Sequence, residues 1–174
     1  MTFMLVMLGM VGPLALQIFL PSMPGLVDEF NTTPAAVQLT ISLYVGAFAF
    51  AQLAYGPISD RFGRRRVILV GLAIYVTAPV VCATAENIET LAAGRALQAI
   101  GGCAGLMFAR VIARDLYDRN RAAGVIGFVT MTTALIGSAT PILGGWIDVS
   151  FGWRLSFWLT SGFGVIVFFI TLIW

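Results

Sequence analysis

The chain has 174 residues, of which 59% are hydrophobic and only 10% are charged, and its net charge is +2. A soluble domain carries roughly 25% charged residues, so this chain lacks the polar surface that a water-soluble protein needs, and we expect lipid to be its main solvent. It contains no histidine and shows neither a nucleophile–base pattern nor a basic patch. The composition therefore predicts no enzyme, no metal site and no nucleic-acid surface.

Six apolar segments follow one another along the chain. Each has about twenty residues, which is long enough to cross a bilayer of roughly 30 Å. Because lipid offers backbone groups no hydrogen-bond partners, these segments must be helices rather than strands. We place them near residues 3–26, 36–56, 67–85, 91–112, 122–146 and 153–174. The predicted fold class is an all-α membrane protein, and the short loops make neighbouring helices antiparallel.

The arginines predict how these helices are oriented. Eight of the ten arginines lie after the second segment or at or beyond the end of the fourth, namely Arg61, Arg64, Arg65 and Arg66, and Arg110, Arg114, Arg119 and Arg121. The opposite side receives mainly acidic residues, and outside the helices its basic residue is Arg154. The positive-inside rule therefore places the two arginine-rich loops and both ends of the chain in the cytoplasm.

The break between the second and third segments carries four arginines and one aspartate within residues 56–66. We expect Pro57 to end the second helix, because proline cannot continue a helical ladder, and Gly63 to allow a tight turn. Asp60 is expected near the start of the third helix, where unpaired backbone donors favour a carboxylate. The loop can then latch a cytoplasmic gate through ion pairs with Asp60 or with carboxylates on other helices. The predicted gating residues are Gly56, Asp60, Arg61, Gly63, Arg64 and Arg65. A simple positive-inside anchor is the alternative, and it is our interpretation of Arg66.

This loop resembles the signature loop between helices 2 and 3 of the major facilitator superfamily. Residues 91–102, including Arg95-Ala96-Leu97-Gln98, resemble its helix 4 motif, and Pro141–Gly145 resembles the helix 5 motif associated with antiporters. Residues 20–24 and 110–117 are similar to Bcr/CflA-type drug-resistance transporters. The resemblance spans the whole chain. It implies that residues 1–174 form the N-terminal six-helix bundle, a 3+3 inverted repeat, with the C-terminal six helices absent.

The resemblance assigns roles to two further groups of residues. Arg95, expected about one turn from the outer end of its helix, matches an arginine that the family ties to proton coupling, and Gln98 shares its face and its partners. The alternative is that Arg95 snorkels to the outer headgroups. On the fifth segment, the antiporter motif comprises Gly137, Pro141, Gly144 and Gly145. Its family interpretation is a kinked, tightly packed helix that limits leakage, and its alternative is ordinary membrane-helix packing.

The sequence also contains an internal echo. Gly144, Asp148, Phe151, Gly152 and Arg154 repeat the pattern of Gly56, Asp60, Phe62, Gly63 and Arg65 if one residue is inserted. The second copy follows the fifth segment as the first follows the second, which is the offset expected of two three-helix repeats with inverted topology. Coincidence is the alternative, because glycines are common here.

One position departs from the family pattern. Gln17 occupies a place where Bcr/CflA-type sequences often have an acidic residue, and an amide cannot carry a proton. The coupling acid is therefore elsewhere, or the driving ion differs. Gln17 can still line the substrate cavity, although a helix-contact role is an equal alternative. The other cavity candidates are Tyr44, Phe48 and Gln52, which share one helix face, and Met107. For these, helix packing is the alternative.

We therefore interpret the chain as half of a drug/proton antiporter of the bacterial inner membrane, which exports small amphipathic compounds by alternating access. Its expected partners are a small-molecule substrate, protons, lipid and the missing C-terminal half. No cofactor is expected beyond a proton gradient as energy source. The alternatives are a non-transporting truncated fragment and a metabolite transporter of the same superfamily with different coupling.

Overall fold

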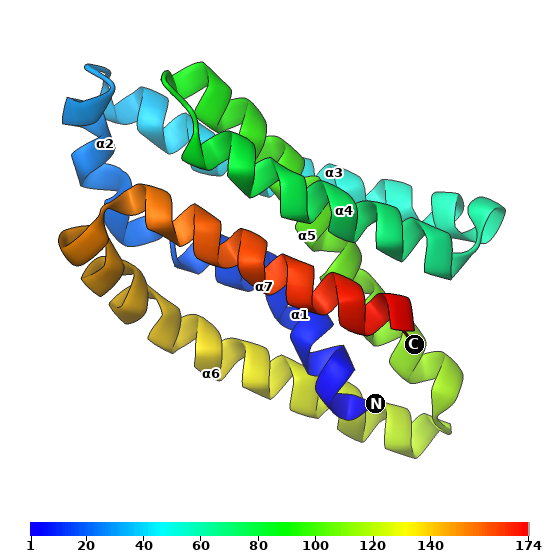
Figure 1. Cartoon of the computed structure of the whole chain (residues 1–174). Helices are drawn as coiled ribbons and strands as arrows, with labels where there is room; N and C mark the ends of the chain where they lie inside the picture. Colours follow the sequence, from blue (N-terminus) through cyan, green and yellow to red (C-terminus); the bar gives the residue numbers. More distant parts are fainter. Residues whose placement is uncertain (174) are drawn as a thin grey trace.

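The computed structural model describes residues 1–173, which are helical with no β-strand among them (Figure 1). The elements are α1 (Thr2–Gln17), η1 (Leu20–Ser22), α2 (Met23–Glu29), α3 (Pro34–Phe62), α4 (Arg64–Ala83), α5 (Ile88–Leu116), α6 (Arg119–Phe151) and α7 (Trp153–Ile173). Six spans are long and apolar enough to cross a membrane, and α1, η1 and α2 together form the first. The prediction of six membrane helices is confirmed. The last residue of the predicted sixth segment, residue 174, lies outside the described residues.

The first span is broken, which corrects the expectation of one helix over residues 3–26. The α-helix ends at Gln17 and a 3-10 turn follows before α2. Pro21 and Pro24 explain the break, because neither has an N–H to donate to the carbonyls of Gln17 and Leu20. As a result, the last carbonyls of α1 have no partners within their own helix. This break lies inside the bundle, so its free carbonyls can accept hydrogen bonds from side chains of other helices.

The second membrane helix is longer than predicted, because Pro57 does not end it. α3 continues through Pro57 to Phe62 and stops at Gly63, whose φ is +85°. A proline in a membrane helix is tolerated where the freed backbone carbonyl is satisfied locally. Pro57 leaves the Leu53 carbonyl without its usual donor, while the Ser59 hydroxyl donates to a different carbonyl, that of Gly56, at 2.9 Å. The expectation for Asp60 was therefore wrong, since this residue lies in the last turn of α3 and not at the start of the next helix.

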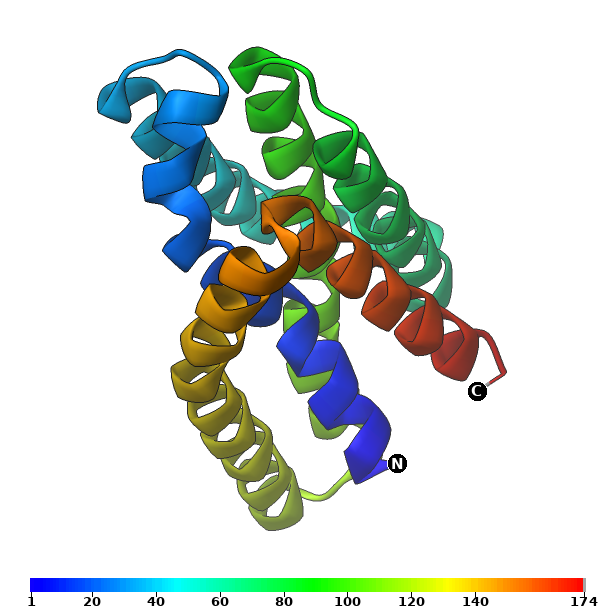
Figure 2. The same cartoon turned by 60° about the vertical axis from the view of Figure 1, so that its left-hand side comes forward.

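Helix α5 is the central element, and it packs against α1, α3 and α4. Figure 2 shows it running through the middle of the bundle. Glycines on α5 permit this close packing: a Cβ at Gly102 would lie 3.0 Å from the Gly12 Cα, and one at Gly101 would lie 2.7 Å from the Tyr75 Cα. Small residues let membrane helices approach closely. Polar side chains on α5 are thereby carried into the interior of the bundle.

The two chain ends lie at the same end of the bundle as the α3–α4 and α5–α6 connections (Figure 1). The α4–α5 and α6–α7 connections lie at the opposite end. Gly63 between α3 and α4 and Gly152 between α6 and α7 each form a one-residue connection, with φ of +85° and +83°. Each donates its N–H to the carbonyl four residues earlier, on Ser59 and Asp148 respectively. The two halves of the predicted echo thus adopt the same local conformation.

Candidate functional site

Arg95 lies at the centre of the candidate site and is 0% exposed. Its Nη1 donates to the Ala15 carbonyl oxygen at 3.0 Å and to Gln98 Oε1 at 2.7 Å. Since α5 begins at Ile88, Arg95 lies about two turns inside the helix, and not one turn from its end as expected. The snorkelling alternative is excluded, because the guanidinium is enclosed by the bundle instead of reaching its surface.

Aromatic rings surround the Arg95 guanidinium. Its central carbon lies 4.3 Å from the ring centroid of Tyr44, 4.6 Å from that of Phe19 and 5.9 Å from that of Phe157. Each desolvated cation–π contact is worth about 2 kcal/mol. Among residues 1–173, no carboxylate forms an ion pair with Arg95, and its Nε and Nη2 have no hydrogen-bond partner. The buried charge is therefore held by neutral groups, with two donor nitrogens, Nε and Nη2, to spare.

The break in the first span supplies the carbonyl that Arg95 contacts. Ala15 is among the last residues of α1, where carbonyl oxygens lack an intrahelical donor and the helix dipole is negative. A cation at this position satisfies an orphan acceptor and is stabilised by the dipole. Arg95 thus ties the end of α1 to α5, at the point where the first span changes direction.

Gln98 extends this site to α7. Its Nε2 donates to Thr160 Oγ1 at 3.4 Å, and the Thr160 hydroxyl donates to the Phe157 carbonyl oxygen at 2.9 Å. Gln98 and Thr160 are both 0% exposed. Gln98 lies on the same face as Arg95 and bonds to it directly, as the spacing predicts. The two side chains share no other partner, since Arg95 contacts Ala15 and Gln98 contacts Thr160. Thr160, Phe19 and Phe157 were not predicted. The available signal was a threonine within an apolar segment, since phenylalanine is common in such segments.

Tyr44 joins the Arg95 site, while the other two residues of its predicted face do not. Its hydroxyl donates to the Gly12 carbonyl oxygen at 2.9 Å, and its ring stacks on Phe48 with centroids 6.4 Å apart. Phe48 is half-buried and Gln52 is exposed. The spacing along α3 therefore puts the three side chains on one side of the helix but at different distances from the bundle interior.

A second polar region surrounds Gln17. It is a groove of about 440 Å³ between α1, α5 and α6. The groove is lined by Pro13, Gln17, Leu106, Arg110, Val129, Thr130, Thr133, Ala134, Gly137, Ser138 and Pro141. Gln17 thus lies against an open groove with a mixed polar and apolar lining, which agrees with its cavity-lining interpretation. Arg110 in the same groove was predicted only as an orientation marker, because it was counted with the arginines at the end of the helix; α5 in fact continues to Leu116.

The arginine turn between α3 and α4 contacts two other helices. Arg64 forms an ion pair with Asp115 in the last turn of α5. Arg65 Nη2 donates to the Leu172 carbonyl oxygen of α7 at 2.8 Å. Asp60 is exposed, and it forms no ion pair within residues 1–173. Of the two pairings predicted for this loop, the one with a carboxylate on another helix is observed and the one with Asp60 is not.

Comparison with known proteins agrees with this architecture. The sequence profile described as "Major Facilitator Superfamily" matches residues 5–174. The chain belongs to the major facilitator superfamily. It is 36% identical over 151 residues to "Multidrug resistance protein D" of Escherichia coli K12, which covers 87% of this chain and 38% of that protein. It is 32% identical over 165 residues to "Multidrug resistance protein MdtL" of E. coli SMS-3-5, which covers 95% of this chain and 42% of that protein. The same values hold for MdtL of Escherichia fergusonii. The chain thus spans less than half the length of these relatives.

The motif predicted on the fifth membrane helix, which is α6 in the structure, divides into two structural parts. A Cβ at Gly144 would lie 3.0 Å from the Ile18 carbonyl carbon, so α6 presses closely on the end of α1. A Cβ at Gly145 would lie 3.6 Å from the Pro21 Cβ, which is ordinary contact, and one at Gly137 would meet nothing within 4 Å. Gly144 is therefore a close-packing position, whereas Gly137 and Pro141 line the groove of Gln17.

Met107 is the last of the predicted cavity residues. It is half-buried and packs against the hydrophobic core to which α1, α3, α4, α5, α6 and α7 all contribute. It lies neither among the residues that line the groove of Gln17 nor among the groups that contact Arg95. Its position favours the packing interpretation.

Proposed function

We propose that this chain forms the N-terminal half of a proton-coupled multidrug exporter of the bacterial inner membrane, of the Bcr/CflA type. The observation that carries the proposal is the buried Arg95 site, which joins α1, α5 and α7 in a member of a superfamily of transporters. Two E. coli relatives are named multidrug resistance proteins. We place the arginine-rich end of the bundle in the cytoplasm by the positive-inside rule.

A second six-helix half would complete the transport pathway. α3 and α6 carry large apolar side chains that are exposed in this half, among them Leu53 (79%) and Trp146 (63%). In alternating access, the two halves rock around a site near the bilayer midplane. The broken first span, with Gln17 beside the open groove, supplies the polar wall on this side of such a site.

Arg95 is proposed to couple substrate movement to proton movement. Its Nε and Nη2 have no acceptor among residues 1–173, and an unpaired buried donor costs about 1–3 kcal/mol. An acceptor that approaches during the cycle would relieve this cost and bias the equilibrium between states. The carboxylates of this half all lie near helix ends, and Gln17 cannot titrate. We therefore assign the proton-carrying acid to the other half.

The arginine turn is proposed to act as the cytoplasmic latch. Its contacts with Asp115 and Leu172 hold α4 against α5 and α7 at one end of the bundle. Asp60 is exposed on the same turn, and Gly56, one helical turn earlier, leaves open space beside the backbone. We propose that a donor from the second half pairs with Asp60 when the cytoplasmic side is closed.

The full-length protein, expressed in an E. coli strain lacking its major drug exporters, provides the test. We expect resistance to several chemically unrelated cationic or neutral drugs, and drug-dependent proton release from energised inverted vesicles. Arg95→Met should abolish both, and Asp60→Asn should lower transport with normal membrane insertion. Arg121→Gln, which removes an exposed arginine at the same end of the bundle, serves as the control. Wild-type resistance in the Arg95→Met strain would overturn the role of Arg95.

A metabolite transporter with different coupling is the second candidate, and Gln17 is the observation that favours it. If the full-length protein confers no drug resistance but moves a polar metabolite across the membrane, the result would favour this candidate. Proton release during drug export would decide against it. If the full-length gene encodes no second half, the absence of any transport by the chain would identify a non-transporting fragment.

A further inference from the structure

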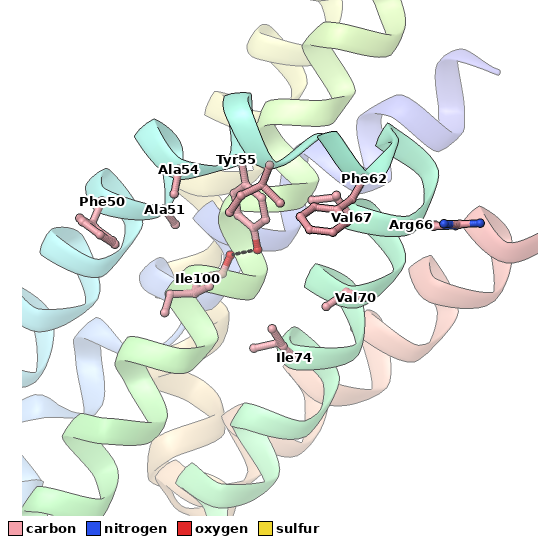
Figure 3. Close-up of a pocket in the computed structure, with 11 residues that line it drawn as sticks. Phe50, Ala51, Ala54, Tyr55, Phe62, Arg66, Val67, Val70, Ile74 and Ile100 are labelled. Carbon is pink, nitrogen blue, oxygen red and sulfur yellow. Dashed lines mark hydrogen bonds between the residues drawn. The ribbon is translucent and has the colours of Figure 1, made fainter. Parts of the chain in front are cut away.

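A second cavity lies on the far side of α3, outside the proposed transport site. It is an apolar groove of about 460 Å³ between α3, α4 and α5. Its lining comprises Phe50, Ala51, Ala54, Tyr55, Ile58, Phe62, Arg66, Val67, Val70, Ile74 and Ile100, most of which Figure 3 labels. The Tyr55 hydroxyl, the polar group within it, is occupied by donating to the Ile100 carbonyl oxygen at 2.9 Å. Apart from Arg66 at one end, the groove wall therefore offers only apolar contact to an occupant.

The groove does not face the side of α3 that carries Gly56 and Asp60. At 3.6 residues per turn, Ala54 and Ile58 each lie about 160° around the helix from Gly56, whereas Asp60 lies only about 40° from it. The groove and the Asp60 side chain are thus on opposite sides of α3. A second half that pairs with Asp60 would leave the groove open to the surrounding bilayer.

One end of the groove is strongly basic. Figure 3 shows Arg66 at the end near the α3–α4 turn, with its guanidinium directed away from the apolar residues. A neighbouring hollow is lined by Phe62, Gly63, Arg64, Arg65, Arg66, Leu69 and Leu172, so it shares Phe62 and Arg66 with the groove. Arg64 and Arg65 have protein partners, but Arg66 is exposed and has none within residues 1–173. Arg66 is therefore the arginine of this hollow that is available to a ligand.

We propose that this composite surface binds an anionic phospholipid of the cytoplasmic leaflet. One acyl chain lies in the apolar groove, which runs about 12 Å along α4 from Arg66 to Ile74 at 1.5 Å per residue. The phosphate lies in the arginine hollow and pairs with Arg66. Basic pockets between membrane helices on the cytoplasmic side favour anionic headgroups. The apolar groove and the adjoining arginine hollow match the acyl chain and the phosphate of such a lipid.

The test uses the full-length protein in nanodiscs that contain equal amounts of phosphatidylglycerol and phosphatidylcholine. Native mass spectrometry then measures how much of each lipid the extracted protein retains. We expect wild type to retain phosphatidylglycerol preferentially. Arg66→Gln should lower this retention about fivefold, from the attraction that one arginine contributes near an anionic surface. Ala54→Phe, which fills the groove, should lower retention of both lipids.

Two matched variants control for charge and for bulk. Arg121→Gln removes an exposed arginine at the same end of the bundle, and Ala73→Phe adds the same side chain at an exposed α4 position outside the groove. Both should retain lipid as wild type does. Equal losses in Arg66→Gln and Arg121→Gln would reduce the effect to general surface charge and overturn the site. Equal retention of the two lipids by wild type, or no effect of Ala54→Phe, would also overturn it. Lipid retention requires no transport, so this result is independent of the proposed export function.

Discussion

The close contact between α6 and the end of α1 makes Gly144→Ala the most informative stability test. A Cβ at Gly144 would overlap the Ile18 carbonyl oxygen and lie 3.0 Å from its carbon and 3.2 Å from its Cα. These are backbone atoms, which cannot rotate away as a side chain can. Gly145 is the matched control, because its added Cβ would meet only the Pro21 Cβ, at 3.6 Å. Both glycines lie inside α6, so the gain in helix propensity is common to the two variants.

The difference between the two variants therefore isolates the steric effect. Overpacking by a methyl group costs about 1–3 kcal/mol, and replacing glycine by alanine in a helix gains about 1 kcal/mol. We expect Gly145→Ala to be neutral or stabilising. Gly144→Ala should have a free energy of unfolding lower than that of Gly145→Ala by about 1–3 kcal/mol.

Reversible unfolding of the full-length protein by sodium dodecyl sulfate in mixed micelles measures this difference. Because Ile18 directly follows α1, Gly144→Ala should also displace the carbonyl end of α1 from Arg95 and lower export by more than its stability loss explains. If both variants unfold with the same free energy, α6 does not press on the α1 terminus and the packing described here is incorrect.

Three further predictions use the same unfolding measurement. Tyr44→Phe should lower the free energy of unfolding by about 1 kcal/mol, because it removes a buried hydrogen bond. Tyr75→Phe should be neutral or stabilising, because the buried Tyr75 hydroxyl has no partner within residues 1–173. Equal costs for the two variants would argue against this assignment. Gly63→Ala should lower the free energy of unfolding by about 1–3 kcal/mol, because the φ of +85° strains any residue with a Cβ. Gly162→Ala, at an open helical position, should not lower it. A neutral Gly63→Ala would contradict the turn geometry. Arg95→Met should abolish export but change the free energy of unfolding by less than about 2 kcal/mol, since the lost contacts are offset by removal of a buried charge. A large loss of stability would assign Arg95 a structural role instead.

Much of the architecture was predictable because it depends on local sequence. Length and hydropathy located the six spans, since a bilayer of roughly 30 Å requires about twenty apolar residues. Gly63 was identifiable as a turn, because a positive φ favours glycine. The effect of Pro57 was misjudged by the rule for soluble helices, because proline is tolerated inside membrane helices.

The Arg95 site was only half predictable. Spacing along one helix placed Gln98 on the same face as Arg95, because residues three apart are neighbours on a helix. The Ala15 carbonyl and the Phe157 ring lie 80 and 62 positions away in the sequence, and only helix packing brings them to the guanidinium. For the same reason, the sequence did not reveal that Arg110 shares a groove with Gln17.

The sequence by itself determined that this is a six-helix membrane bundle with arginine turns at one end, because those features follow from hydropathy and charge along the chain. The tertiary structure decided how its charges are used. Arg95 is enclosed by aromatic rings and a broken helix end, Arg64 pairs with α5, and Arg66 is left at the mouth of an apolar groove. The physical reason is that the partners of a charge are set by which helices touch, and glycines on α5 and α6 determine how closely they do.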